Sequence, residues 1–580
     1  MRLIKTPLDI PASGVSDNDI FLGSWCLKNF EDFLNAKNEN HILHYHWDDR
    51  VKFHKDYFHL DALYEKILSR FSNLLNAIHK VDNNVDYWRI IIGPWLRYCL
   101  DALFDRYECI RLAMKSGKIS SCNLGNYEIK DWCPKDFSSF WVYFLTDEWN
   151  EVIFSECIKY HNLSFSINDK LFLEPQRIKN TKSIKKPFKY LLKTLLNLVG
   201  KYKRGAVFVA PYTSYKKIFK LQLRLKQIPN ILFTDIPNIV TSTCDKRRSF
   251  FLKDIKNSGF EGFADELLPS LIPKSYLEDF SYIKNFVLKS LPLNPRQIFT
   301  SNAYQSDDVF KIWVAEKKLT GTKYYIGQHG GNFGSARLCQ TEVHQLKTSD
   351  KYLSWGWKSN IFNNIEIIPS IQLSERSSIK PLKKGKILHI LNAIPRYFYS
   401  YQSFPNAEHF LLYLNDQLDF LSHLNRENRS DLNIRLDRSG EKRSWDIFNL
   451  LSREGFFSNI DPNKEQFLQL LQKSKLCVST TNTTVFIETL SLNFPTVIFW
   501  NPNHSELRDE AVHFFKLLED AEILFHCPMQ AAKKVNSISK NIDAWWFSEK
   551  VQTVRKKFCE RYALASNSWL NEWCEFLKPN

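Results

Sequence analysis

The chain has 580 residues, a formal net charge of +16 and a hydrophobic content of 44%. This length exceeds what one hydrophobic core normally supports, so we expect two domains, with room for a third. The aromatic content of 14% excludes a fibrous or disordered protein. The basic excess suits three kinds of partner: nucleic acid, an anionic membrane surface or phosphorylated small molecules.

The amino terminus lacks the pattern of a targeting segment. No run of eighteen apolar residues occurs in the chain, and Pro7 and Pro11 interrupt the first residues before a signal-peptide stretch can form. We therefore expect a cytoplasmic protein. The twelve cysteines are scattered singly, without the paired spacing of zinc or redox sites, so we expect them to be reduced and structural.

Residues 1–204 are expected to form a helical, aromatic-rich entry region, with clear helical spacing over residues 59–81. In HILHYHWDDR, residues 41–50, His44 and His46 would share one face of a strand, but no set of four metal ligands emerges. The last three residues of this segment, Asp48, Asp49 and Arg50, are candidates for the acceptor side of a site.

The basic segment 179–205 carries apolar residues at helical spacing. Its lysines could meet anionic headgroups while its leucines sit in the membrane interface. A helix between domains is the alternative interpretation of the same pattern.

From residue 205 onward, short β-branched runs alternate with helical segments, which is typical of a parallel sheet wrapped by helices. A helix is predicted from Asp307 or Asp308 to Gly321, between two of these strands. A polar stretch over 360–384 is the best candidate for a linker. The strands are predicted at 206–210, 230–235, 297–301, 323–328, 386–393, 432–437, 475–480 and 496–500.

We therefore predict an α/β fold with two Rossmann-like domains that face a cleft. The first domain would span 1–375, with its Rossmann-like part over about 205–375. The second would span 385–540, and C-terminal helices would follow over 541–580. In such sheets, ligands bind at the carboxyl ends of the strands.

The strongest local signal lies in residues 475–502, where a buried strand ends in a hydroxyl-rich turn before a helix. The free N–H groups at the helix start would hold a phosphate, and Glu488 could accept hydrogen bonds from a ribose diol. Alternatively, the hydroxyls only cap the helix and Glu488 is solvated. The hydroxyl residues assigned to nucleotide binding are Ser479, Thr480, Thr481, Thr483 and Thr484.

A second signal is YYIGQHGGNFGSAR, residues 324–337, in which a strand runs into Gln328, His329, Gly330 and Gly331. Gln328 and the two glycines are assigned to binding of the nucleotide sugar. The glycines let the backbone approach a ligand closely. His329 can act as a base towards an acceptor hydroxyl or hold a phosphate oxygen. The alternative is a glycine turn with a hydrogen-bonded histidine. The spacing matches neither the Walker pattern nor G-x-G-x-x-G.

Two further pairs of charged residues follow predicted strands. Asp307 and Asp308 could serve as a carboxylate base or as a nucleophile towards an anomeric carbon, or one of them could only cap a helix. Arg435 and Arg438 could bind a phosphate or a sugar carboxylate. Surface arginines would explain the second pair equally well.

A family resemblance rests on five segments: FLGSWC, HWDDR, YWRIIIGPWL, GQHGGNFG and FIETLSLNFPTV. Together they resemble transferases of bacterial O-antigen and surface-polysaccharide clusters, over most of the chain. The hydroxyl-rich turn and its helix also look like the donor-binding segment of GT-B glycosyltransferases.

This resemblance implies a metal-independent GT-B glycosyltransferase without a cofactor. The basic excess and the segment 179–205 suit a peripheral position on the inner face of the cytoplasmic membrane. It would transfer an acidic sugar, a nonulosonic acid or a Kdo-like sugar, from a CMP-activated donor to a glycan or lipid-linked acceptor. Residues 385–540 would then bind the nucleotide sugar, and 1–375 the acceptor.

Two other functions remain open. CDP-glycerol polyol-phosphate transferases look similar through their own His-Gly segment. A non-catalytic glycan or membrane scaffold could keep the same fold. Nucleic acid is not an expected partner, because no nucleic-acid-binding motif occurs.

Overall fold

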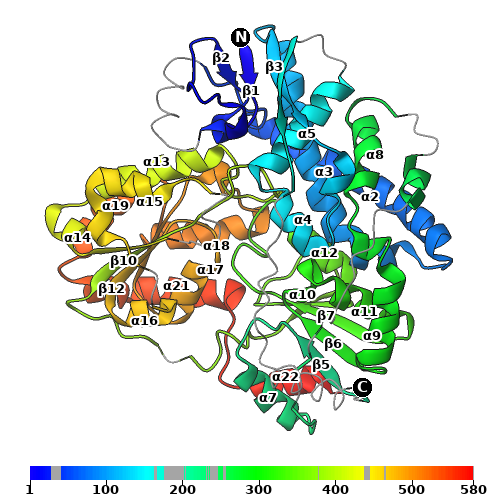
Figure 1. The fold of residues 1–580 in the computed structure, drawn as a ribbon. Coiled ribbons are helices and arrows are strands. Elements are labelled where there is room, and N and C mark those ends of the chain that lie inside the picture. Colours follow the sequence, from blue (N-terminus) through cyan, green and yellow to red (C-terminus); the bar gives the residue numbers. More distant parts are fainter. Residues whose placement is uncertain are drawn as a thin grey trace.

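The computed structural model describes the chain except residues 28–40, 162–165, 176–200, 203, 230, 233, 235–245, 253–256, 377, 437–443, 463–464 and 579–580. Three separate parallel sheets with helices around them make up the protein (Figure 1), which confirms the predicted α/β class.

The sheet nearest the amino terminus differs from the expectation of a purely helical entry region. Its strand order is β2-β1-β3-β4, and its strands pair in parallel. Two of the strands are only three residues long, too short to show a period in the sequence. The strands are β1 (Arg2–Ile4), β2 (Asp19–Phe21), β3 (Ser121–Asn126) and β4 (Ser166–Phe172).

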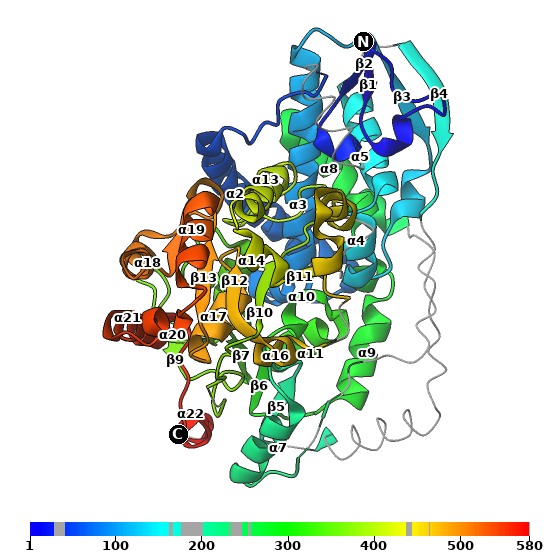
Figure 2. The ribbon, with the colours of Figure 1, turned by 90° about the vertical axis from the view of Figure 1, so that its left-hand side faces the viewer.

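Two long helices, α2 (Arg50–His79) and α3 (Val85–Lys115), connect this sheet to the rest of the protein. Helix α2 contains the predicted helical stretch 59–81 up to His79. Helix α3 is buried along nearly all of its length and packs against α2, α11 and α5. Figure 2 shows it passing through the middle of the molecule. The shorter helices here are α4 (Phe137–Tyr143) and α5 (Asp147–Tyr160).

The second sheet has the order β5-β6-β7-β8-β9. Three of its predicted strands are confirmed, whereas Ile231, Leu232 and Thr234 form no strand and the supposed linker 360–384 contains β9. Its strands are β5 (Ala206–Val209), β6 (Gln297–Thr300), β7 (Lys323–Gly327), β8 (Lys351–Ser354) and β9 (Ile365–Ile367). Its helices are α7 (Tyr215–Arg224), α8 (Gly259–Leu271), α9 (Phe280–Ser290), α10 (Ala303–Ser306), α11 (Asp308–Leu319) and α12 (Gln340–Thr348).

The third sheet has the order β11-β10-β12-β13-β14, and all four predicted strands after residue 385 are confirmed. Its strands are β10 (Lys386–Leu391), β11 (Leu432–Leu436), β12 (Ser474–Ser479), β13 (Thr496–Phe499) and β14 (Leu524–Phe525). Its helices are α13 (His409–Ser422), α14 (Arg426–Ser430), α15 (Ile447–Leu451), α16 (Phe467–Gln472), α17 (Thr484–Ser491), α18 (Asp509–Asp520) and α19 (Pro528–Ile538).

The carboxyl-terminal helices return the chain to the second sheet. They are α20 (Ile542–Trp546), α21 (Glu549–Tyr562) and α22 (Trp569–Leu577). Trp569 and Trp573 of α22 are buried in one apolar cluster with Phe208 and Phe299 of the second sheet. Figure 1 shows α22 beside α7, so the end of the chain joins the domain formed by the middle of the chain.

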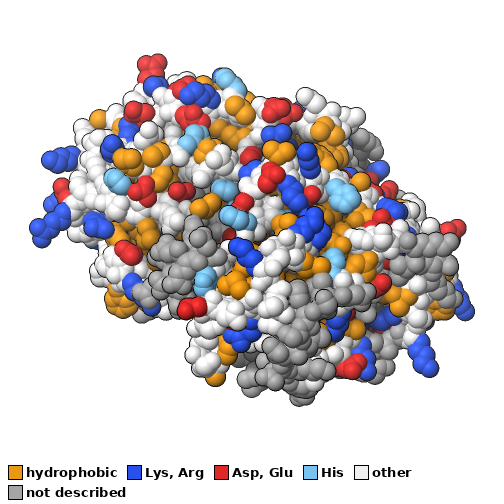
Figure 3. Space-filling view, turned by 90° about the horizontal axis from the view of Figure 1, so that it is seen from above, with side chains coloured by type: hydrophobic (Ala, Val, Ile, Leu, Met, Phe, Trp, Pro, Cys, Tyr) orange, Lys and Arg blue, Asp and Glu red, His pale blue; other side chains and the backbone are white. Residues whose placement is uncertain are grey.

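The surface carries mixed charge. On the face in Figure 3, basic and acidic side chains are interspersed, with no continuous patch of one sign. Among the described residues, no helix is long and apolar enough to cross a membrane. The proposed membrane-contact segment 179–205 lies almost wholly outside the described residues.

Candidate active site

The loops that follow β7 and β12 meet at the boundary between the second and third sheets. The backbone N–H of Gly331 donates a hydrogen bond to Thr484 Oγ1 at 3.3 Å. A Cβ atom at position 331 would lie 2.2 Å from the carbonyl oxygen of Thr483, so only glycine allows this approach. The two segments that the sequence singled out are therefore neighbours, each at the carboxyl end of a parallel strand.

His329 is surrounded by aromatic rings. Its ring centroid lies 4.8 Å from that of Phe333, 6.1 Å from that of Tyr304 and 6.4 Å from that of Tyr212. Its Nδ1 is buried and has no hydrogen-bond partner among the described residues. Desolvation lowers the pKa of His329 to about 4, so the imidazole is neutral at neutral pH. A neutral imidazole can accept a proton from a hydroxyl.

Gln328 shapes the loop that carries this histidine. Its Oε1 accepts hydrogen bonds from the backbone N–H of Trp355 at 2.9 Å and from Trp357 Nε1 at 2.8 Å. Its Nε2 donates to the carbonyl oxygen of Gly330 at 2.9 Å. Because the side chain is buried and both its ends are occupied, Gln328 positions the loop and is not free to bind a donor, in contrast to the role predicted for it.

The hydroxyls of the turn after β12 divide into two groups. Ser479 is buried within the strand, and Thr480 donates to the carbonyl oxygen of Ile390 at 2.9 Å. Thr481 and Thr483, by contrast, contact one another at 3.0 Å near the start of α17. Thr483 does not cap α17 with its side chain. Helix α17 therefore begins without a side-chain cap, and its first turn, with the positive end of the helix dipole, lies beside the Gly331 loop.

Glu488 is not a solvated helix residue. It is 9% exposed, and its Oε2 pairs with Arg376 Nη1 at 3.1 Å. Arg376 belongs to the segment that connects the two larger domains. Burial raises the pKa of Tyr212 to about 12, and the negative charge of Glu488 acts in the same direction. The ring of this tyrosine is the one that lies 6.4 Å from that of His329.

Asp307 and Asp308 lie in a different environment from His329. Asp307 caps α11 by accepting a hydrogen bond from the backbone N–H of Phe310 at 2.9 Å. Asp308 accepts from Tyr276 Oη at 2.8 Å and pairs with Lys311 Nζ at 2.8 Å. Both aspartates line a separate acidic cavity, so the structure gives them no place in the His329 site and assigns Asp307 the capping role.

The two predicted arginines also have other surroundings. Arg435 lies on the edge strand β11, and its Nη1 donates to the carbonyl oxygen of Glu465 at 3.1 Å. Arg438 lies outside the described residues. The described part of the structure therefore does not bring an arginine of this pair to the Gly331–Thr484 contact.

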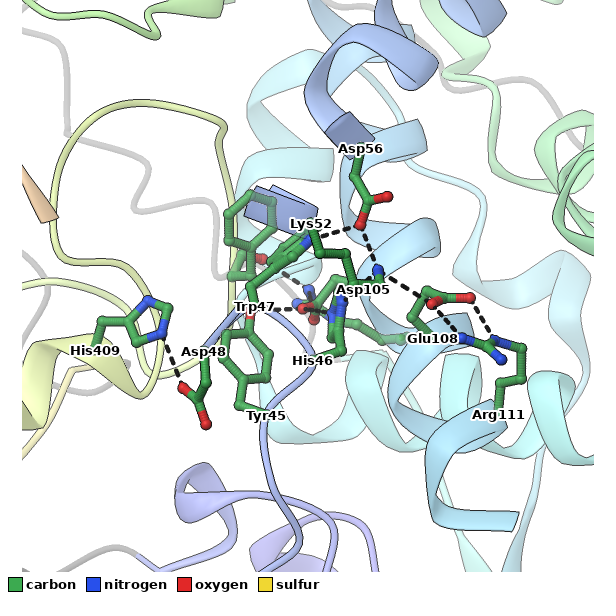
Figure 4. A network of polar contacts seen from close by, with 12 residues as sticks. Tyr45, His46, Trp47, Asp48, Lys52, Asp56, Asp105, Glu108, Arg111 and His409 are labelled. Atoms are coloured by element: carbon green, nitrogen blue, oxygen red, sulfur yellow. Dashed lines mark hydrogen bonds and ion pairs between the residues drawn. The ribbon is translucent and has the colours of Figure 1, made fainter. Parts of the chain in front are cut away.

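The acceptor-side candidates join the start of α2 to the third-sheet domain. Asp49 caps α2 by accepting from the backbone N–H of Val51 at 2.9 Å. Asp48 Oδ1 lies 3.1 Å from His409 Nε2, as Figure 4 shows. Arg50 Nη2 lies 2.5 Å from Glu506 Oε1. Leu507, the residue after Glu506, pairs with Ala336, which follows Gly331 in the loop after β7.

Figure 4 also shows a buried polar network around His46. The predicted strand over residues 41–50 is absent there: His44 is exposed and His46 is buried. His46, Asp105 and Cys109 place potential metal ligands within 4.8 Å of one another. However, Asp105 already accepts hydrogen bonds from Tyr45 Oη at 2.6 Å and Arg106 Nη1 at 2.8 Å. The arginine charge opposes a cation here, which favours a structural network.

The sequence model of the LIC12162 family transferase matches residues 1–577. The chain belongs to this family. No protein of curated function matches the sequence.

Solved structures resemble this family member only weakly. MurG of Acinetobacter baumannii has a TM-score of 0.32 at 11% identity, covering 65% of this chain and 99% of that chain. The N-terminal domain of Candida albicans trehalose-6-phosphate phosphatase has a TM-score of 0.31 at 13% identity, covering 67% and 92%. WaaG, a glycosyltransferase involved in lipopolysaccharide biosynthesis, has a TM-score of 0.28 at 8% identity, covering 65% and 100%.

Four residues around the site of this transferase were missed in the sequence: Tyr212, Tyr304, Arg376 and Asn392. Tyr212 and Tyr304 each follow a predicted strand by two or three residues. Asn392 lies at the end of the predicted strand 386–393, directly after β10, and contacts Thr481 Oγ1 through its amide nitrogen. The rule that ligands bind at the carboxyl ends of parallel strands would have selected these three. Arg376 gives no such signal, because it lies in a polar connecting segment.

Proposed function

We propose that this LIC12162 family transferase is a GT-B glycosyltransferase that transfers an acidic sugar from a CMP-activated donor to a glycan or lipid-linked acceptor. The observation that carries the proposal is the contact between Gly331 and Thr484. It brings a neutral imidazole and an uncapped helix start together at the carboxyl ends of two parallel sheets.

Each part of this site has a role in the proposed reaction. The free backbone N–H groups of the first turn of α17 hold the donor phosphate beside the Gly331 loop, and Glu488 meets the ribose diol. His329 takes the proton of the acceptor hydroxyl as its oxygen attacks the anomeric carbon. The bond between that carbon and the phosphate oxygen breaks, and CMP leaves with the bonding electron pair.

The negative charge that develops on the departing CMP needs stabilisation. In the proposed mechanism the positive end of the α17 dipole and the hydroxyls of Thr483 and Thr484 provide it. These groups are fixed by the fold before the donor binds, so they need no metal ion. The basic excess of the chain, +16, supports an anionic donor and work at the inner face of the cytoplasmic membrane.

CMP release from CMP-activated nonulosonic acids and from CMP-Kdo, in the presence of a glycan acceptor, tests the proposal. We expect release by the wild type and a loss of at least about 100-fold in His329→Gln, the usual range for a general base. His526→Gln is the matched control, because His526 is surface-exposed and pairs with Glu519.

The outcomes separate the candidate functions. No release from any CMP-sugar refutes the donor assignment. Transfer from CDP-glycerol with the phosphate retained in the product identifies a polyol-phosphate transferase instead. A scaffold would keep its biological role in both His329→Gln and Glu488→Gln.

A further inference from the structure

Another cavity lies beside Tyr304, bounded by α2, α3, α10 and α12. It is narrow, with about 490 Å³ of empty space, part of it open to solvent. Four of the side chains that line it carry aromatic rings: Tyr64, Tyr98, Tyr304 and His344. No role in the donor site described above uses this cavity.

The aromatic wall of the cavity is held in place by hydrogen bonds at its edges. Gln345 Nε2 donates to Tyr304 Oη at 3.0 Å, and Gln305 Nε2 donates to Tyr98 Oη at 3.0 Å. The ring of His344 stacks on Tyr304, with centroids 5.9 Å apart and an angle of 28° between the rings. These contacts fix flat, mainly apolar faces towards the cavity before any ligand binds.

His344 is a neutral polar group in this wall. Burial lowers the pKa of His344 to about 3, and nearby cations, Arg89 first among them, act in the same direction. Among the described residues, its imidazole has ring contacts but no hydrogen-bond partner. A neutral imidazole offers a ligand one donor and one acceptor.

The polar side of the cavity alternates in charge. Arg97 Nη1 pairs with Asp61 at 3.0 Å, Lys347 Nζ lies 3.7 Å from Asp61 and 2.8 Å from Glu65, and Arg89 pairs with Glu65 at 2.8 Å. The remaining amino group of Arg97, Nη2, is buried without a hydrogen-bond partner among the described residues.

This alternation selects the class of ligand. Asp61 is the one carboxylate in the lining, and Glu65 pairs with two of the three basic side chains from outside it. These pairs neutralise the basic side chains, so the wall favours neither an anion nor a cation. Hydroxyl groups both donate and accept hydrogen bonds, so a polyol can satisfy both kinds of neighbour. Flat apolar faces beside such a row match a sugar ring, whose C–H face is apolar and whose edge carries hydroxyls.

From this arrangement we propose that the cavity is the subsite for a sugar ring of the acceptor glycan. The inference rests on the proposed glycosyltransferase function. Tyr304 links the two places, because its ring contacts both His329 at 6.1 Å and His344 at 5.9 Å. Only the ring of Tyr304 would therefore separate a sugar bound in the cavity from His329, the candidate base.

Gly93 provides a direct way to narrow the cavity. A Cβ atom at this position would lie 2.7 Å from Tyr64 Oη and 3.2 Å from His344 Cε1. Gly93→Ala is therefore expected to push both rings into the space of the ligand. His344→Leu removes the polar group while keeping a side chain of similar size, and His526→Leu is the matched surface control.

Saturation-transfer NMR with a panel of methyl glycosides measures sugar binding directly. We expect saturation transfer to a glycoside from the wild type and from His526→Leu, and binding about tenfold weaker in Gly93→Ala and His344→Leu, equivalent to about 1.4 kcal/mol. In the transfer assay, both cavity variants should raise the KM for the acceptor about tenfold more than the KM for the donor.

The two readouts separate the subsite from the proposed function. Sugar binding that the cavity variants weaken, without CMP release from any donor, supports the subsite and refutes the donor assignment. The absence of saturation transfer from the wild type to any methyl glycoside overturns the subsite, as does binding that neither variant changes. If circular dichroism shows that Gly93→Ala does not fold, the sugar binding measured with His344→Leu is the deciding result.

Discussion

The substitution Gly331→Ala tests the contact on which the donor site depends. The added Cβ would lie 2.2 Å from the carbonyl oxygen of Thr483, whereas an ordinary van der Waals contact begins at 3.4 Å. The two loops must therefore separate by about 1.2 Å to accommodate it. The obstructing atom belongs to the backbone, so a change of side-chain rotamer cannot relieve the clash.

A displacement of about 1 Å between reacting groups can reduce an enzymatic rate by about 100-fold. We therefore expect Gly331→Ala to lose about two orders of magnitude in the rate of CMP release from the donor. The free energy of unfolding should fall by only about 1–3 kcal/mol, as for other overpacked positions. Steady-state CMP release and urea denaturation measure the two quantities on the same preparation.

The neighbouring glycine supplies a matched control. A Cβ at Gly330 would lie 2.9 Å from Thr484 Oγ1, a side-chain atom that can rotate away. Gly330→Ala should therefore lose less activity than Gly331→Ala. Wild-type activity in Gly331→Ala would refute the reasoning, because the loops would then not need to approach one another.

Three further predictions concern the surroundings of the site. Asp308→Asn breaks a buried ion pair with Lys311 and should lower the free energy of urea unfolding by about 3–5 kcal/mol. Asp307→Ala removes only a helix cap, so it should lower that free energy by about 1 kcal/mol and keep the activity per folded molecule. A large loss of kcat in Asp307→Ala would return Asp307 to the catalytic site. Glu488→Gln should raise the KM for the donor about tenfold with an unchanged circular dichroism spectrum, since it loses a charged hydrogen-bond acceptor; an unchanged KM would place the ribose elsewhere. Burial lowers the pKa of His389 to about 4, so between pH 6.5 and 4 the unfolded chain binds a proton that the folded chain does not, and stability falls as the pH falls. Chemical denaturation should show about 2 kcal/mol less stability from this residue at pH 5 than at pH 7, a difference that His389→Gln removes.

The sequence revealed the two larger sheets because their strands are buried on both faces. All six residues of β12 are buried, and such strands appear as continuous apolar runs between helical segments. The amino-terminal sheet gave no comparable signal, because β1 and β2 have three residues each and β3, which pairs with β1, lies more than a hundred residues after it. Pairing over such a separation follows from tertiary packing and leaves no local pattern.

The candidate site was predictable in part. The end of β7 and the end of β12 could each be assigned from a strand followed by a distinctive turn. Their contact joins two different sheets and depends on how the domains pack, which no local rule supplies. Asp307 shows why a local pattern can mislead. An aspartate just after a strand fits both a helix cap and a catalytic carboxylate, so the sequence does not distinguish the two roles.

A crystal structure with CMP bound tests the central claim most directly. The account predicts the CMP phosphate within hydrogen-bond distance of the backbone N–H groups in the first turn of α17, beside the Gly331 loop, with the ribose against Glu488. CMP bound away from this contact, for example in the acidic cavity beside Asp308, would contradict it.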